Sequence, residues 1–194
     1  GFFLLRINGE DVEDVIDYEQ LTAETHVTLE LETKSGKIVT AEVDKEEYEP
    51  LGIYFESGLM SKVRSCKNKC VFCFIDQMPK GGRDTLHFKD DDWRLSLIMG
   101  NYVSLTNVDD KEFDRMLRRR VSPLYVSIHA TDGAVRTRMM ANPSAARIME
   151  RLTALKEYGL CFHGQIVVCP GLNDGDVLKK SLNDLYALRP ATKT

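Results

Sequence analysis

Segments typical of strands and of helices alternate along the chain from about residue 51 onward. The predicted strands cover residues 52–55, 102–106, 125–129 and 162–169, and the predicted helices cover residues 109–120, 144–158 and 176–188. Strands and helices that alternate in this way form a parallel sheet with right-handed crossovers. We therefore expect an α/β fold for this part of the chain.

The first 56 residues have a different pattern. Apolar and polar residues alternate over residues 27–33 and again over 38–43, with a turn sequence between them, which predicts a β-hairpin with one solvated face. Residues 12–22 have a loose helical spacing. These features predict a small β-rich domain at residues 1–56.

Composition excludes several classes of protein. The 194 residues carry a net charge of −4, which provides no basic surface for a nucleic-acid backbone. No stretch approaches the roughly 20 apolar residues of a membrane span. The five cysteines are an odd number and follow no secretory segment, so they are a poor match to a disulfide framework. We expect a cytoplasmic protein without nucleic-acid or membrane partners.

Three cysteines stand close together, at Cys66, Cys70 and Cys73. A tight loop can direct three thiols onto one iron–sulfur cluster. Zinc usually takes four protein ligands in a closed site, and the nearest further candidate, His87, lies fourteen residues beyond Cys73. The spacing favours a cluster with one iron left open, and a zinc site and unligated buried cysteines are the alternatives.

This triplet resembles the CxxxCxxC loop of the radical S-adenosylmethionine (SAM) superfamily, which follows the first strand of a partial (β/α)6 barrel. The resemblance implies that Cys66, Cys70 and Cys73 ligate a [4Fe-4S] cluster. It also implies that the amino and carboxylate groups of SAM bind the open iron and that Phe72 lies near the adenine.

Further stretches resemble one bacterial subfamily whose members carry a PDZ-like domain, a radical SAM domain and a C-terminal domain of unknown function. These stretches are residues 73–81, 89–92, 106–107, 122–132 and 169–174. Residues 4–12 are similar to the strand and turn of PDZ modules. The resemblance implies an N-terminally truncated PDZ-like domain at residues 1–56. It implies a C-terminally truncated radical SAM domain at residues 57–194, an incomplete TIM-like barrel with about four of six βα units.

Polar side chains share one face of each predicted strand that follows the cysteines. Ser104 and Thr106 share a face, as do Ser127 and His129, and His163 and Gln165. Helices cover the outer face of a barrel, so polar faces indicate a lumen that holds a polar ligand.

Ligands of such folds bind at the carboxyl ends of the strands. Members of the superfamily usually hold the methionine amino group with a Gly-Gly-Glu motif, and Thr106 and Asn107 occupy the matching position here. The resemblance assigns this contact to them and the ribose hydroxyls to Gln165 or His163. Ser127 and His129 are expected beside the same ligand.

Two other features have structural interpretations. The acidic run at Asp90, Asp91 and Asp92 is typical of a helix N-terminus, and predicts a helix that begins near Trp93. Cys161 and Cys169 are expected as packed structural residues.

The resemblance implies a radical SAM enzyme, similar to iron–sulfur oxidoreductases, that cleaves SAM reductively to a 5′-deoxyadenosyl radical. The radical then abstracts hydrogen from an unidentified substrate. A flavodoxin or ferredoxin is the expected electron donor. Two alternatives are a non-catalytic PDZ-like adaptor that binds peptides, and a zinc hydrolase that uses His87 or His129.

Overall fold

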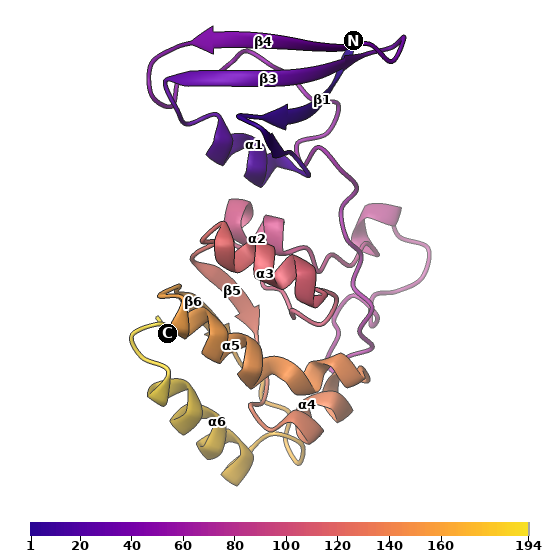
Figure 1. Cartoon of the computed structure of the whole chain (residues 1–194). Coiled ribbons are helices and arrows are strands. Elements are labelled where there is room, and N and C mark those ends of the chain that lie inside the picture. The colour runs from indigo at the N-terminus through magenta and orange to yellow at the C-terminus, as the bar shows by residue number, and fades with distance from the viewer. Residues whose placement is uncertain (194) are drawn as a thin grey trace. The chain divides into compact units, whose positions relative to one another are not determined.

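The computed structural model describes residues 1–193 and divides into two compact units, Gly1–Val63 and Arg64–Thr194. The first unit is an antiparallel sheet with one helix (Figure 1). Its strands are β1 (Phe2–Ile7), β2 (Glu10–Asp11), β3 (His26–Thr33) and β4 (Ile38–Asp44), in the order β2-β1-β3-β4. The predicted hairpin is thereby confirmed as β3 and β4, which pair from His26–Asp44 to Glu32–Ile38.

A tight turn and a capped helix complete the first unit. Asn8 and Gly9 join β1 to β2 with φ values of 52° and 81°, which are the left-handed values that a two-residue hairpin turn requires. Helix α1 (Val15–Leu21) begins at Asp14, whose carboxylate accepts a hydrogen bond from the Ile16 N–H at 3.0 Å. The core of this unit consists of Ile7, Tyr18, Leu21, Val27 and Leu29.

The strand predicted at residues 52–55 is wrong. This segment pairs with no strand, and Gly52 has a φ of +69°, which interrupts an extended backbone. Its apolar residues Ile53 and Phe55 pack instead on the core of the first unit. The segment therefore belongs with the β-rich unit and is not the first strand of the α/β unit.

The second unit has a parallel sheet whose neighbouring strands follow one another in sequence. Strands β5 (Leu124–Ser127) and β6 (Phe162–Gln165) pair along four residues each. Single parallel bridges extend the sheet on both sides, from Val103 to Val126 and from Phe162 to Thr192. The predicted α/β class with parallel pairing is confirmed.

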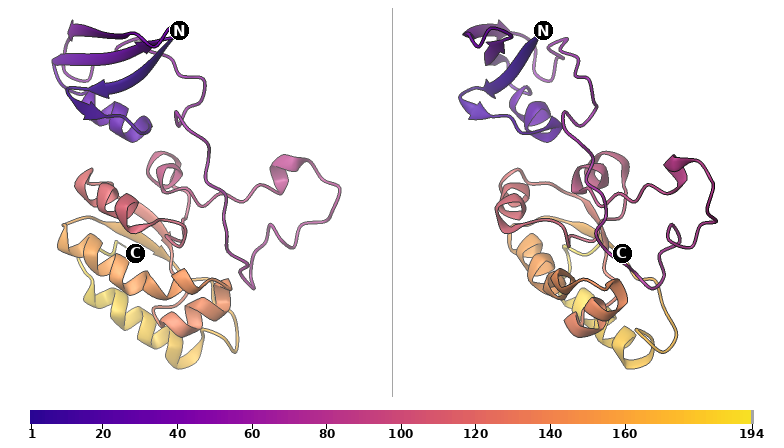
Figure 2. Two further views of the ribbon diagram at one scale, coloured as in Figure 1. Left: turned by 45° about the vertical axis from the view of Figure 1, so that its right-hand side comes forward. Right: turned by 90° about the vertical axis from the view of Figure 1, so that its right-hand side faces the viewer.

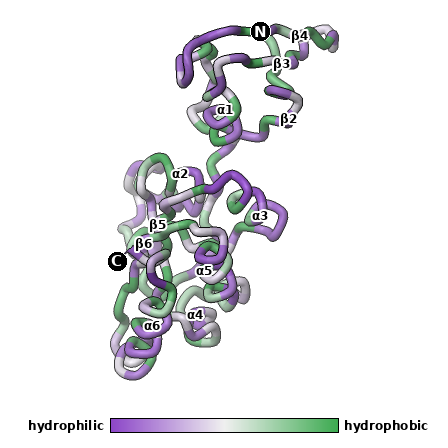
Figure 3. Tube along the Cα trace, turned by 60° about the vertical axis from the view of Figure 1, so that its left-hand side comes forward, coloured by the Kyte–Doolittle hydropathy of each residue, from purple (hydrophilic) through white to green (hydrophobic). Residues whose placement is uncertain are grey.

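Helices connect the neighbouring members of this sheet. Figure 2 shows α5 and α6 side by side, and Figure 3 shows hydrophobic and hydrophilic segments along these helices. The helices are α2 (Trp93–Met99), α3 (Asp110–Arg118), α4 (Gly133–Met140), α5 (Ile148–Glu157) and α6 (Gly175–Ala187), with short 3₁₀ turns η1 (Asp84–Leu86) and η2 (Pro143–Arg147). Among residues 1–193, no helix has the length and apolar character needed to cross a membrane.

Polar caps determine where several helices begin. The Asp109 carboxylate accepts from the Glu112 N–H at 2.8 Å at the start of α3, and Asp92 accepts from the Arg94 N–H at 3.1 Å at the start of α2. The helix predicted to begin near Trp93 is thus confirmed, as are the helices predicted near α3, α5 and α6. Helix α4 was not predicted.

Three predicted strands are shorter in the structure, and two of them end where the backbone turns to a left-handed conformation. Leu105 and His129 have φ values of 59° and 62°, so the extended backbone ends before them. The prediction of a strand at residues 102–106 is therefore reduced to a bridge at Val103, and β5 ends at Ser127. Beyond Gln165, backbone N–H groups bond to side chains instead of to a neighbouring strand, which ends β6.

Candidate functional site

The cysteine loop lies against the end of helix α4. The backbone N–H groups of Lys69 and Val71 donate to the carbonyls of Met140 and Met139, at 3.0 and 2.9 Å. An apolar cluster of Met139, Met140 and Ala145 contacts Cys70, Phe72, Val135, Cys169 and Leu172. The loop is therefore packed on α4 and on the loop that follows β6.

Asn68, between the first two cysteines, fixes the loop to the end of the Val103 segment. Its side chain is almost fully buried and donates to Ser104 Oγ at 3.0 Å. Its Oδ1 accepts from Thr106 Oγ1 at 2.9 Å and from Asn142 Nδ2 at 2.8 Å. A fully bonded buried amide of this kind specifies one position for the loop.

Each residue of the run 89–92 has a separate structural role. Lys89 donates to the Asn68 carbonyl at 3.1 Å, and the Asp90 carboxylate accepts from Asn101 at 3.0 Å. Asp91 accepts from the Ser104 N–H at 2.6 Å and from its hydroxyl. Asp92 forms a buried ion pair with Arg94 at 2.6 Å. The acidic run is therefore a set of local anchors.

Burial and hydrogen bonds move the pKa values of these carboxyls in opposite directions. Burial raises the pKa of Asp91 above its ordinary value, although the hydrogen bonds from Ser104 oppose the shift. Burial also acts to raise the pKa of Asp92, but the hydrogen bonds from Arg94 and Arg64 outweigh it and lower that pKa. Asp92 is thus held as an anion at the start of α2.

Phe72 and His129 contact each other, with ring centroids 4.3 Å apart. His129 is buried, and its Nδ1 accepts a hydrogen bond from the Val167 N–H at 3.2 Å. Burial, with a smaller effect of the Arg136 charge, lowers the pKa of His129 to about 3. The ring is therefore neutral near pH 7 and supports Phe72.

The three thiols of the triplet are half-buried and close enough to affect one another. All five cysteines of the chain are free. Burial, together with the charges of Cys66 and Cys73, raises the pKa of Cys70 to about 11. Burial also raises the pKa of Cys66. A bound metal would reverse this effect, because positive charge beside a thiol favours its thiolate.

The arrangement of the donor side chains bears on which metal they could hold. Within residues 1–193, no group of three or more His, Cys, Asp or Glu side chains is arranged around one metal ion. This arrangement gives no support to a zinc centre. An iron–sulfur cube makes a different demand, because each thiolate binds a separate iron. Three half-buried thiols on one packed loop offer one ligand for each of three irons.

Arg136 of α4 binds the ends of the sheet together and was not predicted. Its guanidinium donates to the carbonyls of Ile128, Ala145, Ser104 and Ser127, each at 2.8 Å. Burial lowers its pKa to about 10, so the side chain stays charged at neutral pH. A buried cation thus lies behind the cysteine loop, where it also favours thiolate at Cys70.

Thr106 and Asn107, which were expected to hold the methionine group, differ in their hydrogen bonding. Thr106 is buried and hydrogen-bonded to Asn68. Asn107 is different, because its Oδ1 is buried without a hydrogen-bond partner. Within the described residues one other buried side-chain atom, Arg64 Nη1, is without a hydrogen bond, and it forms an ion pair with Glu112. Asn107 Oδ1 is therefore a buried acceptor without a partner among the described residues.

The remaining predicted site residues lie on the face of the sheet that is opposite the buried side chains. Ser127 and Gln165 are paired across β5 and β6, and Gln165 is exposed. His163 stacks on Tyr125 with centroids 4.8 Å apart, and Tyr102 meets Tyr125 edge-on at 5.4 Å. The face of the sheet that was expected to be polar thus also carries a row of contacting rings, Tyr102, Tyr125 and His163.

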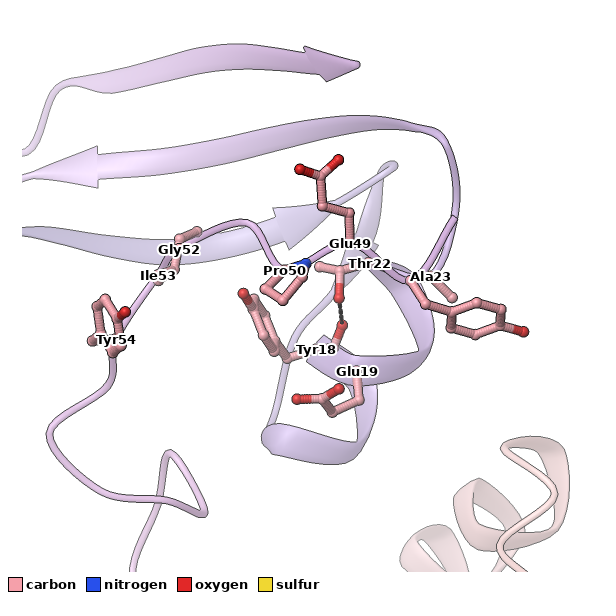
Figure 4. A pocket seen from close by; sticks show the side chains of 10 residues that line it. Tyr18, Glu19, Thr22, Ala23, Glu49, Pro50, Gly52, Ile53 and Tyr54 are labelled. Carbon is pink, nitrogen blue, oxygen red and sulfur yellow. Dashed lines mark hydrogen bonds between the residues drawn. The ribbon is translucent and has the colours of Figure 1, made fainter. Parts of the chain in front are cut away.

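A pocket of about 270 Å³ lies in the first unit, between α1 and residues 48–54 (Figure 4). Tyr18 and Thr22 line it from the helix, where the Thr22 hydroxyl donates to the Tyr18 carbonyl at 2.7 Å. It contains none of the predicted site residues. The pocket is thus separate from the cysteine loop. Peptide binding by the first unit stays a prediction.

Comparison with known proteins assigns the larger part of the chain. The family described as a radical SAM-like domain matches residues 45–194, which is more than half of the chain. A search of curated proteins finds no match. The chain belongs to the radical SAM-like domain family.

Proposed function

We propose that this protein binds a [4Fe-4S] cluster through Cys66, Cys70 and Cys73 and uses it to cleave SAM reductively. The observation that carries the proposal is the packed cysteine loop itself. Three interacting thiols are held against α4 by backbone hydrogen bonds, and the loop places Phe72 on His129. Together with membership of the radical SAM-like family, this arrangement favours a redox cofactor over a structural metal.

The chain's own residues would hold and orient the cofactors. The three thiolates would bind three irons, leaving the fourth for the amino and carboxylate groups of SAM. Asn107 Oδ1, a buried acceptor without a partner, suits a donor such as an amino group. Phe72 on His129 offers an apolar surface for the adenine. Ser127, His163 and Gln165 are proposed to border the ligand from the sheet.

The cofactors supply the chemistry once bound. Held by the three cysteines, a reduced cluster would supply one electron for cleavage of the SAM sulfonium to methionine, and the adenosyl fragment would gain a hydrogen atom from the substrate and leave as 5′-deoxyadenosine. The electron would come from a protein donor of the flavodoxin or ferredoxin class. We expect this oxygen-sensitive chemistry in the reducing cytosol.

The sheet order supports a partial barrel as the frame of this site. Neighbours in the sheet, from Val103 through β5 and β6 to Thr192, follow chain order and are parallel, as in a β/α barrel. We also propose that the first unit is PDZ-like. Its strand, Asn-Gly turn and capped helix α1 support that proposal.

The experiment is anaerobic reconstitution with iron and sulfide, followed by dithionite and SAM. We expect cluster absorbance and release of 5′-deoxyadenosine from the parent protein. Cys70→Ala should lose both, while Cys161→Ala, a half-buried cysteine outside the triplet, should keep both. Equal iron and equal 5′-deoxyadenosine from the parent and Cys70→Ala would refute the proposal.

A further inference from the structure

Lys89 spans the cysteine loop from one end to the other. Its ammonium donates to the carbonyl of Asn68, between the first two cysteines, at 3.1 Å. It also donates to the carboxylate of Asp76, three residues after Cys73, at 2.8 Å. The Lys89 side chain is 20% exposed and that of Asp76 is 49% exposed. The ammonium of Lys89 therefore lies on the buried side of the loop, and the carboxylate of Asp76 lies on its solvent side.

The backbone of Lys89 is fixed to the same loop. Its carbonyl accepts from the Cys66 N–H at 2.8 Å, and the adjacent Ser65 and Asp90 form an antiparallel bridge. The ion pair closes the base of residues 77–88, which extend away from the helices in both views of Figure 2. The position of the ammonium is thus set by backbone and side-chain contacts together.

The charge of Lys89 acts on all three thiols. It lowers the pKa of Cys66 and of Cys70, against the larger effect of burial. Burial acts to lower the pKa of Lys89, but the Asp76 hydrogen bond and the charges of Cys73 and Cys66 raise it overall. The ammonium is held by hydrogen bonds between the first two cysteines and just beyond the third, so it favours negative charge added within the loop.

We propose that Lys89 is a positioning residue that raises the reduction potential of the bound cluster, and that Asp76 moderates this effect. The inference rests on the proposed function, because it requires the cluster. One-electron reduction adds a negative charge to the cluster, so a nearby cation stabilises the reduced form and a nearby anion destabilises it. The partial burial of Lys89 limits screening by solvent and salt.

The experiment uses the full chain, reconstituted anaerobically with iron and sulfide. The midpoint potential is measured by reductive titration with dithionite, followed by electron paramagnetic resonance (EPR). Lys89→Met should lower the midpoint potential and Asp76→Asn should raise it, while Lys89→Arg should stay near the parent value. Lys111→Met, an exposed lysine on α3, makes the same change in net charge away from the loop and should leave the midpoint unchanged.

The opposite directions of the two expected midpoint shifts distinguish an electrostatic role of Lys89 from a structural one. A lysine that only holds the loop would, on substitution, reduce iron content without moving the midpoint of the remaining cluster, and that result would overturn the inference. Shifts of the same sign in Lys89→Met and Asp76→Asn would overturn it too. If Lys89→Met takes up no iron, the Asp76→Asn midpoint decides, and an unchanged value contradicts the inference. A parent that takes up no cluster refutes the proposed function as well.

Discussion

His129 combines a buried neutral ring with a left-handed backbone at the end of β5. Its pKa of about 3 lies below the ordinary value of 6.5, chiefly because of burial. The unfolded chain therefore binds a proton that the folded chain does not bind between these two values. The stability that the neutral ring contributes is fully present above pH 6.5 and is lost as the pH falls from there toward 3.

We predict that His129→Asn flattens this acid dependence. Asparagine is neutral, accepts a hydrogen bond and tolerates a positive φ. The free energy of unfolding of the parent should fall between pH 6.5 and 5 by about 1.4 kcal/mol per pH unit more than that of the variant. Denaturant unfolding at a series of pH values measures the difference, and parallel curves would show that His129 is not the titrating group.

Asn68 should be the most sensitive position of the cysteine loop outside the ligands. Asn68→Ala removes hydrogen bonds to the Ser104 and Thr106 hydroxyls and to the Asn142 amide at a buried position, which should lower the free energy of unfolding by about 2–3 kcal/mol. Lys67→Ala, at the exposed neighbouring position, should change it by less than about 0.5 kcal/mol. Chemical denaturation measures both, and equal effects would show that Asn68 is not the anchor.

Substitution of Asn107, in contrast to that of Asn68, should affect ligand binding and not stability. Its Oδ1 has no partner in the protein, so Asn107→Ala should leave the free energy of unfolding nearly unchanged. Loss of a hydrogen bond from the amino group should weaken SAM binding to the reconstituted protein about tenfold. Calorimetric titration with SAM tests this, and unchanged affinity would assign the amino group to another acceptor.

Helix α4 carries more of the site than any other helix. Its last carbonyls hold the cysteine loop, and its buried Arg136 joins the ends of the sheet. The helix begins at Asp132, whose carboxylate accepts from the N–H groups of Ala134 and Val135 at 3.0 and 2.9 Å. The backbone of its first residue, Gly133, is close to η2.

We predict that Gly133→Ala destabilises the protein although alanine favours helices. A β-carbon there would meet the carbonyl oxygen of Ala146 at 2.9 Å, so one of the two segments must move. The expected decrease in the free energy of unfolding is about 1–3 kcal/mol. Gly58→Ala, where a β-carbon meets nothing within 4 Å, is the control in thermal unfolding. An equal or smaller effect at Gly133 would contradict the close packing.

The sequence predicted the helices whose apolar spacing and caps are local, such as α3 with Asp109. It could not predict α4, because a buried arginine interrupts the apolar face of that helix. The predicted strand ends failed at Leu105 and His129, whose left-handed backbones depend on contacts distant in sequence. The same is true of Asn68, an ordinary loop residue until the fold brings Ser104, Thr106 and Asn142 to it.

Over the whole chain, two units with separate cores carry different features. The family match begins within the first unit, at residue 45, and covers all of the second. Residues 51–55 belong to the matched range by sequence and to the β-rich core by packing, and the strand predicted at 52–55 was wrong for that reason. The candidate chemistry is confined to the second unit, where loop, α4 and sheet meet.

The central claim is that the cysteine loop holds a cluster with an iron open to SAM. The most direct test is the EPR spectrum of the reconstituted, dithionite-reduced protein, recorded with and without SAM. SAM should change the spectrum, because binding of its amino and carboxylate groups alters the coordination of one iron. A cluster signal that SAM leaves unchanged, or a parent protein without any cluster signal, would contradict the claim.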